Sequence, residues 1–535
     1  MEYEKAPLNI EKEDVLLVKP SKSTSSCILS LSTLDNKGAN NNIAQTVHVY
    51  RSSSIHDYDS SFNPCHVFKE ALSKALFYYY PLAGRLVRHT DGKFRVKINT
   101  DSVEFGVPFL EATANCTLSS LHYLDNTNTE IAKHLVLDLP SPQDKNYPLV
   151  LMVTKFLCGG FTIGMGMSHA ICDGFGASQF FKAILELARG RTEPSVKPVW
   201  ERENQVGTIT TQPFPQCPMD RESVAFSPFV NQPNTKIIKQ YCFKVEGETI
   251  TRLKLSLMNE NIRFTTFEVL AGYVWRSRAR ALKLSSNDKT MLNVLVGIRR
   301  NLMDYETLPK GYYGNSTIDA KVVLKVSELD EMPLYKIVKL IKETKNIAFT
   351  ADYVRNSINS LETNQEDGLS MELEASGAVT VLTEWKHLGF QENLDFGGYE
   401  LVNFLPAPCK MLATVDACIF SSANKLDDHD PSMDGGVRIF TSLPVAAMPK
   451  FKDEIEALSH RVLYALCVLS QIVNDSRVLL GGGWPEMVMA KEIDALDRKT
   501  RGKKSLTMEA FTRALLAIPT TIADNAGLDS AELIS

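Results

Sequence analysis

A proline-rich polar stretch from Gly190 to about Glu222 divides this chain and constrains its fold more than any other feature. Its prolines recur among arginine, threonine and glutamine residues. Because proline removes a backbone donor and fixes φ, such a stretch cannot continue a helix or an inner strand. The chain has 535 residues, which is more than one hydrophobic core usually supports. We therefore expect two folded units joined by a long crossover loop.

The segments on both sides of this stretch alternate strand patterns with helix patterns. The first has strand patterns at 46–50, 94–98, 149–156 and 161–167, and a helix pattern over Val67–Tyr80. The second has a helix pattern over Thr266–Leu282, strand patterns at 291–296 and 377–382, and a final hairpin turning through Asp434, Gly435 and Gly436. These patterns predict α/β units with mixed sheets. The predicted domains are residues 1–190, a crossover loop at 191–222, residues 223–458 and a helical C-terminal appendage at 459–535.

The composition excludes several classes of function. A net charge of -5 gives no basic field for nucleic acid or an anionic membrane. The ten cysteines form neither a CxxC pair nor a zinc-site spacing, so we expect no metal. An apolar stretch over Leu149–Met167 is interrupted by Lys155 and by Gly159-Gly160, which favours two buried strands over a membrane span. The N-terminus carries charges where a signal peptide is apolar, so a cytoplasmic location is expected.

The segment with the clearest chemistry is a strand followed by a tight turn and a helix. The strand pattern over 161–167 leads into His169, then a turn with Gly174 and Gly176, then a helix that ends at Gly190. This places His169 at a strand-to-helix corner. A neutral imidazole, with an ordinary pKa of about 6.5, can take a proton from a hydroxyl or amine attacking a thioester and return it to the leaving thiolate.

The residues alone leave other interpretations of this corner open. A lone histidine beside a buried strand is more often a hydrogen-bonded core residue than a base. A metal site would need more ligands than His169 and Asp173, and the glycines at 174 and 176 do not form the dinucleotide motif GxGxxG. In a compact turn, the carboxylate of Asp173 is expected to accept backbone N–H groups or to pair with an arginine, which would hold the loop.

Residues His169 to Gly174 read HAICDG, and four further motifs occur at other places in the chain. They are Ser32–Asp35, similar to LSxLD; Phe77–Leu86, containing YPLAGR; Phe264–Arg276, FTTFEVLAGYVWR; and Leu308–Ser316, LPKGYYGNS. Together these five motifs make residues 10–458 resemble the BAHD family of plant acyl-CoA-dependent acyltransferases, with HAICDG as its HxxxDG signature. The general pattern is most similar to taxane-type O-acyltransferases and spermidine hydroxycinnamoyl transferases.

The resemblance implies two chloramphenicol-acetyltransferase-like domains with a channel between them, which coenzyme A and the acceptor enter from opposite faces. It implies that His169 is the general base and that Asp173 points to an arginine, for which Arg299 is the matching position. Thr383 and Trp385 match positions near the reacting carbonyl, Thr383 as a donor to the oxyanion and Trp385 there or as wall packing. The expected co-substrates are an acyl-CoA thioester and a small alcohol or amine. No residue is assigned to coenzyme A, no permanent cofactor is expected, and the protein is expected to be a monomer.

The second signature of the family, DFGWG, occurs here in altered form. Asp395, Phe396 and Gly397 are present, but Gly398 and Tyr399 stand where the family has tryptophan and glycine. An aromatic residue is thus displaced by one position and a turn glycine is lost. Because this motif is chiefly structural in the family, with Gly174 and Arg299 as further structural supports, the change is expected to affect the stability of the second domain more than its chemistry.

From about residue 460 the sequence resembles a different protein, the C-terminal equatorial segment of the cytosolic group II chaperonin, with its beta subunit the most similar. Gly481-Gly482-Gly483 matches part of an ATP-binding wall, yet the phosphate loop and hydrolytic aspartate of that family are missing, so no ATP binding is expected. The basic run Arg498–Lys504 is expected to be a solvated loop. Two explanations stay open: a chimeric gene model or transcript, and a natural fusion. The alternative function is a catalytically idle protein that contacts chaperonin through this tail.

Overall fold

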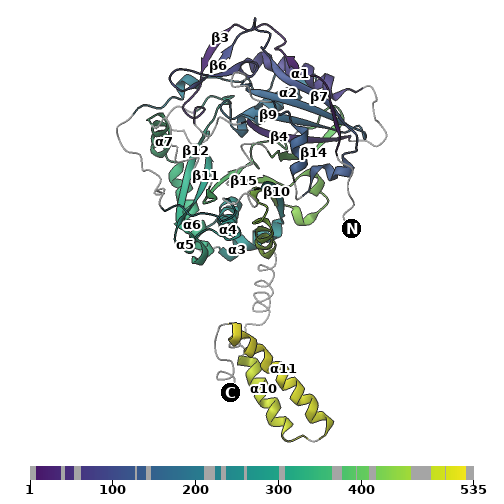
Figure 1. Cartoon of the computed structure of the whole chain (residues 1–535), viewed down its shortest axis with the longest axis vertical. Coiled ribbons are helices and arrows are strands. Elements are labelled where there is room, and N and C mark those ends of the chain that lie inside the picture. The colour runs from purple at the N-terminus through teal and green to yellow at the C-terminus, as the bar shows by residue number, and fades with distance from the viewer. Residues whose placement is uncertain are drawn as a thin grey trace. The chain divides into compact units, whose positions relative to one another are not determined.

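The computed structural model describes residues 8–37, 43–52, 62–126, 129–139, 146–209, 223–230, 237–257, 262–299, 308–363, 376–392, 394–408, 417–458, 484–500 and 502–525. The chain forms two compact units, Met1–Ser459 and His460–Ser535, here called the core unit and the tail unit. No helix among the described residues is both long and apolar enough to cross a bilayer. Figure 1 shows the elements of each unit.

The first sheet of the core unit has seven strands drawn from both sides of the crossover loop. Its order is β1-β7-β8-β9-β4-β14, and β2 also pairs with β7. Pairs are antiparallel except for β7 with β8. The strands are β1 (Ile10–Lys12), β2 (Leu16–Val18), β4 (Ile43–Ser52), β7 (Val107–Ala114), β8 (Leu149–Phe156), β9 (Phe161–Ser168) and β14 (Tyr399–Pro406). Strand β14 comes from the second half of the chain, and its place in this sheet was not predicted.

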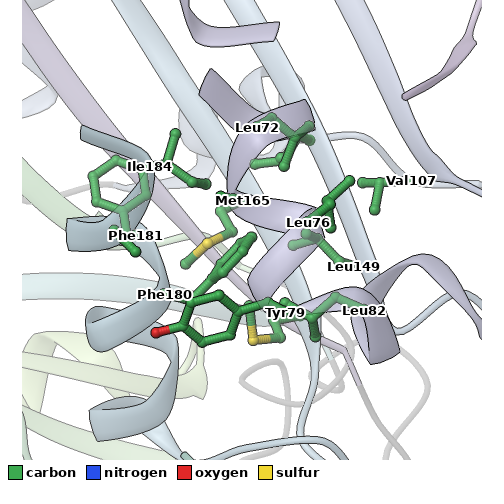
Figure 2. Close-up of a cluster of buried hydrophobic side chains, with 14 of the residues drawn as sticks. Leu72, Leu76, Tyr79, Leu82, Val107, Leu149, Met165, Phe180, Phe181 and Ile184 are labelled. Carbon is green, nitrogen blue, oxygen red and sulfur yellow. The ribbon is translucent and has the colours of Figure 1, made fainter. Parts of the chain in front are cut away.

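Two helices cover this sheet and build the main core. They are α1 (Pro64–Tyr78), followed by a 3₁₀ turn at Tyr80–Ala83, and α2 (Gly174–Ala188). Figure 2 shows Leu72 and Leu76 of α1 and Phe180 and Phe181 of α2 meeting Met165 of β9. All five side chains are at most 2% exposed. This packing fixes the direction in which β9 delivers the chain into α2.

The second sheet contains six strands, all from the second half of the sequence. Its order is β10-β16-β15-β13-β11-β12, with parallel pairs only between β11, β13 and β15. The strands are β10 (Ile238–Val245), β11 (Lys289–Gly297), β12 (Thr317–Lys325), β13 (Val379–Glu384), β15 (Ala417–Ser422) and β16 (Val437–Pro444). The helices of this half include α3 (Gly247–Leu257), α4 (Thr266–Ala281), α5 (Val326–Glu331), α6 (Leu334–Ala348) and α7 (Ala351–Thr363), and residues 448–458 are also helical. A small antiparallel sheet, β3 (Cys27–Ser30), β6 (Phe94–Ile98) and β5 (Arg85–Arg88), belongs to the first half.

The α/β architecture with mixed sheets agrees with the sequence prediction, and one detail differs. Strands β15 and β16 pair antiparallel, as a final hairpin would. Their connection runs over 423–436 with two 3₁₀ turns, at Lys425–Asp427 and Pro431–Met433, and is longer than a hairpin loop usually is. The chain turns at Asp434–Gly436 as predicted, where the Gly436 amide donates to the Met433 carbonyl at 2.8 Å. The side chains of Asn424 and Asp430 cap these two turns and accept hydrogen bonds from backbone amides of the longer connection. The predicted domain boundaries remain predictions.

The described part of the tail unit is a pair of helices, α10 (Trp484–Asp497) and α11 (Lys503–Asn525), which pack on each other. Large apolar side chains on both helices are exposed, including Leu496 at 52%, Leu506 at 67% and Phe511 at 56%. The glycines at 481–483 lie outside the described residues. Exposed apolar faces of this kind promote association.

Candidate active site

The corner after β9 is built by local hydrogen bonds that end a strand and begin a helix. Every residue of β9 is buried, and the Ile171 amide donates to the Ser168 carbonyl at 3.0 Å, which turns the chain. Asp173 then caps α2, because its Oδ1 accepts from the Gly176 amide at 3.0 Å. His169 lies inside this turn and is half-buried.

Asp173 is the centre of a saturated hydrogen-bond network. The Arg299 guanidinium donates to its two oxygens at 2.8 and 3.1 Å, and Ser316 donates to Oδ2 through its amide at 3.0 Å and its hydroxyl at 2.9 Å. Burial alone would raise the pKa of Asp173, but Arg299 and these donors outweigh it and lower the pKa. The pairing predicted with Arg299 is therefore present, and an ionised carboxylate with this many donors is unsuited to accept a proton.

The environment of the His169 imidazole differs from that of the Asp173 carboxylate. Its Nδ1 is buried and has no hydrogen-bond partner among the described residues. Burial lowers the pKa of His169 below its ordinary value, while the negative charge of Asp173 opposes this shift. The imidazole is therefore neutral at pH 7, which is the form that can accept a proton.

A second buried network, for which no role was predicted, holds the same turn from its other side. The Arg202 guanidinium donates to Asp35 at 2.6 Å and to the Ile171 carbonyl at 2.8 Å, and neither charged side chain is exposed. The Asn315 side chain joins Asp35, at 2.8 Å, to the His169 carbonyl, at 2.7 Å. The carbonyls of His169 and Ile171 are thus both linked to the Asp35 carboxylate, through Asn315 and Arg202.

The residues of this second network differ in how clearly the sequence marks them. Asp35 closes the Ser32–Asp35 motif and Asn315 lies in the motif at 308–316, so both could have been proposed as site residues. Arg202 lies in the stretch expected to be an irregular connection, where nothing in the local pattern marks a buried arginine. Asn315 and Ser316 also show that two neighbouring residues of one motif serve two different carboxylates.

The two glycines of the turn, Gly174 and Gly176, differ in the atoms that a Cβ at each position would meet. A Cβ at Gly176 would lie 2.0 Å from the Tyr313 carbonyl oxygen, a backbone atom that cannot move aside. A Cβ at Gly174 would lie 2.6 Å from Leu388 Cδ1, which belongs to a flexible side chain. Gly176 therefore permits the close approach of α2 to the segment that carries Ser316.

Thr383 and Trp385 lie at the end of β13 on the second sheet. Thr383 is half-buried and pairs with Ile419 of β15. Trp385 packs against Phe390 and Phe404, and a cavity of about 340 Å³ lies beside it. Among the described residues, no hydrogen bond joins either of them to His169. The structure therefore gives Trp385 a packing environment and leaves the roles of both residues as predictions.

The altered DFG motif lies at the far end of α2 from His169. Arg189, which follows α2, donates to the Asp395 carbonyl at 2.8 Å, and α2 is 15 residues long, or about 22 Å. Phe396 is buried against Phe161 of β9, and Tyr399 meets the same Phe161 ring edge-on. The displaced aromatic residue therefore packs on the first sheet, and its contribution to stability falls there and not in the second domain.

Gly397 and Gly398 both have positive φ, of +57° and +80°. This pair of left-handed residues forms the turn between Phe396 and Tyr399, whose amides and carbonyls exchange hydrogen bonds at 2.8 Å. The glycine lost after position 398 is thus not required for the turn, because the two that remain supply its conformation.

Comparison with known proteins agrees with this arrangement. The model of the Transferase family matches residues 8–458. A spermidine coumaroyl-CoA acyltransferase of Arabidopsis thaliana is 40% identical over 84% of this chain and 96% of its own, and a spermidine sinapoyl-CoA acyltransferase of the same plant is 39% identical over 84% and 98%. A taxadien-5-alpha-ol O-acetyltransferase of Taxus chinensis is 32% identical over 85% and 98%.

The solved structures show the same fold at lower identity, and the tail has a separate match. Vinorine synthase aligns with a TM-score of 0.61 at 20% identity, over 84% of this chain and 98% of its own. TRI101 of F. sporotrichioides, complexed with coenzyme A and T-2, aligns with a TM-score of 0.59 at 15% identity, over 80% and 97%. Residues 450–535 match the model of the TCP-1/cpn60 chaperonin family. Over its core unit, the chain belongs to the Transferase family of BAHD acyltransferases and is an acyltransferase.

Proposed function

We propose that this enzyme transfers an acyl group from an acyl-CoA thioester to an amine or hydroxyl of a plant specialised metabolite, with His169 as the general base. The observation that carries the proposal is the environment of His169, a neutral imidazole in a turn anchored on both sides by buried ion pairs. Such anchoring holds a base in place before substrate binds, which is what proximity catalysis requires.

The proposed reaction needs one proton acceptor and one oxyanion donor. His169 removes the proton from the acceptor N–H or O–H as its lone pair attacks the thioester carbonyl. The tetrahedral oxyanion accepts a hydrogen bond from the Thr383 hydroxyl and then collapses, which breaks the C–S bond. The departing thiolate of coenzyme A takes the proton from His169, and the base returns to its neutral form. Trp385 would form part of the wall beside the reacting carbonyl.

Among acceptors, we propose an amine of the spermidine class with a hydroxycinnamoyl donor, and taxane-type O-acylation as the second choice. The relatives named for spermidine share more residues with this chain than the relative named for a taxane. Substrate depletion and product mass, measured with coumaroyl-CoA and either spermidine or a taxane alcohol, distinguish the two choices.

The direct test of the base is His169→Ala, measured by release of free coenzyme A thiol. We expect turnover to fall by about a hundredfold or more, the range for loss of a general base, with an unchanged melting temperature. His66→Ala is the matched control, because His66 lies on the exposed surface of α1 with 61% of its side chain accessible. Retention of more than about a tenth of the rate by the His169 variant would overturn the assignment.

An interaction role for the tail unit is the second candidate, supported by its chaperonin-family match and its exposed apolar residues. Binding of the isolated segment 460–535 to purified chaperonin tests it directly. Turnover by the enzyme with no such binding would leave acyl transfer as the function.

A further inference from the structure

One face of the second sheet is partly exposed although its strands lie inside the core unit. Along β11, β12 and β13, the half-buried residues Asn293, Leu295, Asp319, Val381 and Thr383 alternate with fully buried neighbours. Leu295 is directly opposite Asp319, and Asn293 is directly opposite Val381. Since side chains two apart on a strand share a face, all five lie on the same side of the sheet. The residue proposed to hold the oxyanion, Thr383, therefore shares a partly open surface with an acid, Asp319.

Asp319 already holds an alkylammonium group on this face. Lys37, from the first half of the chain, places its Nζ 2.7 Å from both carboxylate oxygens. The two side chains are 22% and 20% exposed. Burial alone would raise the pKa of Asp319, but the charges of Lys37 and Lys321 and hydrogen bonding by Lys37 and Asn293 outweigh it, so the pKa is lowered and the carboxylate is ionised at neutral pH.

The carboxylate lies at a useful distance from the reaction centre. β12 is two strands away from β13 in the sheet order, with β11 between them. Neighbouring strands are about 4.8 Å apart. Two such spacings put Asp319 on β12 roughly 10 Å from Thr383 on β13. Lys37 is also close enough to His169 for its charge to lower the pKa of the imidazole. The pair thus lies on the same sheet face as Thr383, at a separation that a polyamine chain can span.

Lysine is chemically close to one end of a polyamine. Its side chain is a primary ammonium on a flexible four-carbon stem, which is also the structure of the aminobutyl end of spermidine. A site that accepts this group at 2.7 Å on both oxygens has the geometry to accept the substrate's ammonium in its place. The incoming ammonium takes over the charge pairing of Asp319, so displacing Lys37 does not leave the carboxylate unpaired.

We propose that Asp319 binds the distal ammonium of a polyamine acceptor and that Lys37 occupies the site until the substrate displaces it. This inference rests on the proposed function in taking the acceptor to be an amine, and it adds a residue that selects polyamines over monoamines. While one nitrogen reacts at the thioester beside His169, a second, charged nitrogen is held at Asp319. Lys37 competes with the substrate and therefore weakens its binding.

The two partners of this ion pair should then respond in opposite directions, which a purely structural pair would not do. Asp319→Asn should raise KM for spermidine about tenfold, as expected for loss of a charge-assisted hydrogen bond, and lower the spermidine-to-butylamine preference by the same factor. Lys37→Met should lower KM for spermidine. Glu111→Gln is the matched control, because Glu111 pairs with Lys69 at 2.9 Å on the first sheet, and it should leave the preference unchanged.

Calorimetric titration of spermidine into the full-length protein separates this inference from the proposed function. Binding that weakens in Asp319→Asn and tightens in Lys37→Met supports the site even if no amine is acylated, in which case the proposed function fails alone. Acylation of spermidine with the same KM in wild type and Asp319→Asn overturns the site and leaves the function intact. Weaker spermidine binding in both variants would show that the Lys37–Asp319 pair has a structural role, and it would also overturn the proposed site.

Discussion

The carboxylate of Asp173 offers the sharpest test of how the catalytic turn is held, through the substitution Asp173→Asn. The native side chain accepts hydrogen bonds from Gly176, from Arg299 and from the amide and hydroxyl of Ser316. Asparagine keeps one acceptor oxygen and turns an NH₂ group toward donors. It also leaves the charge of Arg299 without a counterion.

The size of the effect follows from the burial of the pair. Removing one partner of a buried ion pair costs about 3–5 kcal/mol. The Arg299 side chain is 17% exposed and keeps the carbonyls of Tyr312 and Gly314 as acceptors, so we expect the lower end, about 3 kcal/mol. Because a displacement of about 1 Å in a catalytic group costs on the order of a hundredfold in rate, kcat should fall with stability.

Thermal and urea unfolding together with thiol-release kinetics measure both effects. Asp395→Asn is the control, because that carboxylate is about half exposed and pairs with Lys425, so it should lose at most about 1 kcal/mol and no activity. The folded-state pKa of Asp173 is lowered, so its contribution to stability is present above the unfolded pKa of about 3.9 and is lost as pH falls below it. The difference in free energy of unfolding between wild type and Asp173→Asn should therefore become smaller at acid pH. Strictly additive losses in the double variant with Arg299→Ala would refute the pairing.

Three further outcomes follow from the structure. Since burial lowers the pKa of His169 and only the neutral form is a base, kcat/KM for a hydroxyl acceptor should rise with pH to a plateau with its midpoint below about 6.5, and a higher midpoint would contradict this; an amine acceptor is unsuited to this measurement because its ammonium group must itself lose a proton before it attacks. Gly176→Ala should lose about 2 kcal/mol or more in urea unfolding because its Cβ meets the Tyr313 carbonyl, whereas Gly297→Ala, with open space, should change little; equal losses would count against the close-approach argument. Deletion of residues 460–535 should preserve specific activity and raise soluble yield, and a lower melting temperature would show that the tail supports the core unit.

Local sequence patterns predicted helices and strands of this fold, but they did not predict contacts between segments that are distant in the chain. The strand, turn and helix around His169 follow from apolar spacing and two glycines, which are local signals. Arg202 could not be placed in this way, because its burial depends on Asp35, which is 167 positions earlier in the chain. For the same reason residues 399–406 were expected in the second domain: nothing in their local pattern shows that they form β14 and pair with β4 of the first sheet.

The pairing of β14 with β4 has a consequence for how the protein is made. A ribosome releases residues 43–52 well before residues 399–406, and at ordinary rates of synthesis the interval is on the order of tens of seconds. During that time the outer edge of β4 has no strand to bond with, and an open edge is a template for pairing with another nascent chain. The yield of native enzyme in a foreign host should therefore depend on translation speed and on chaperones that cover this edge until the second half arrives.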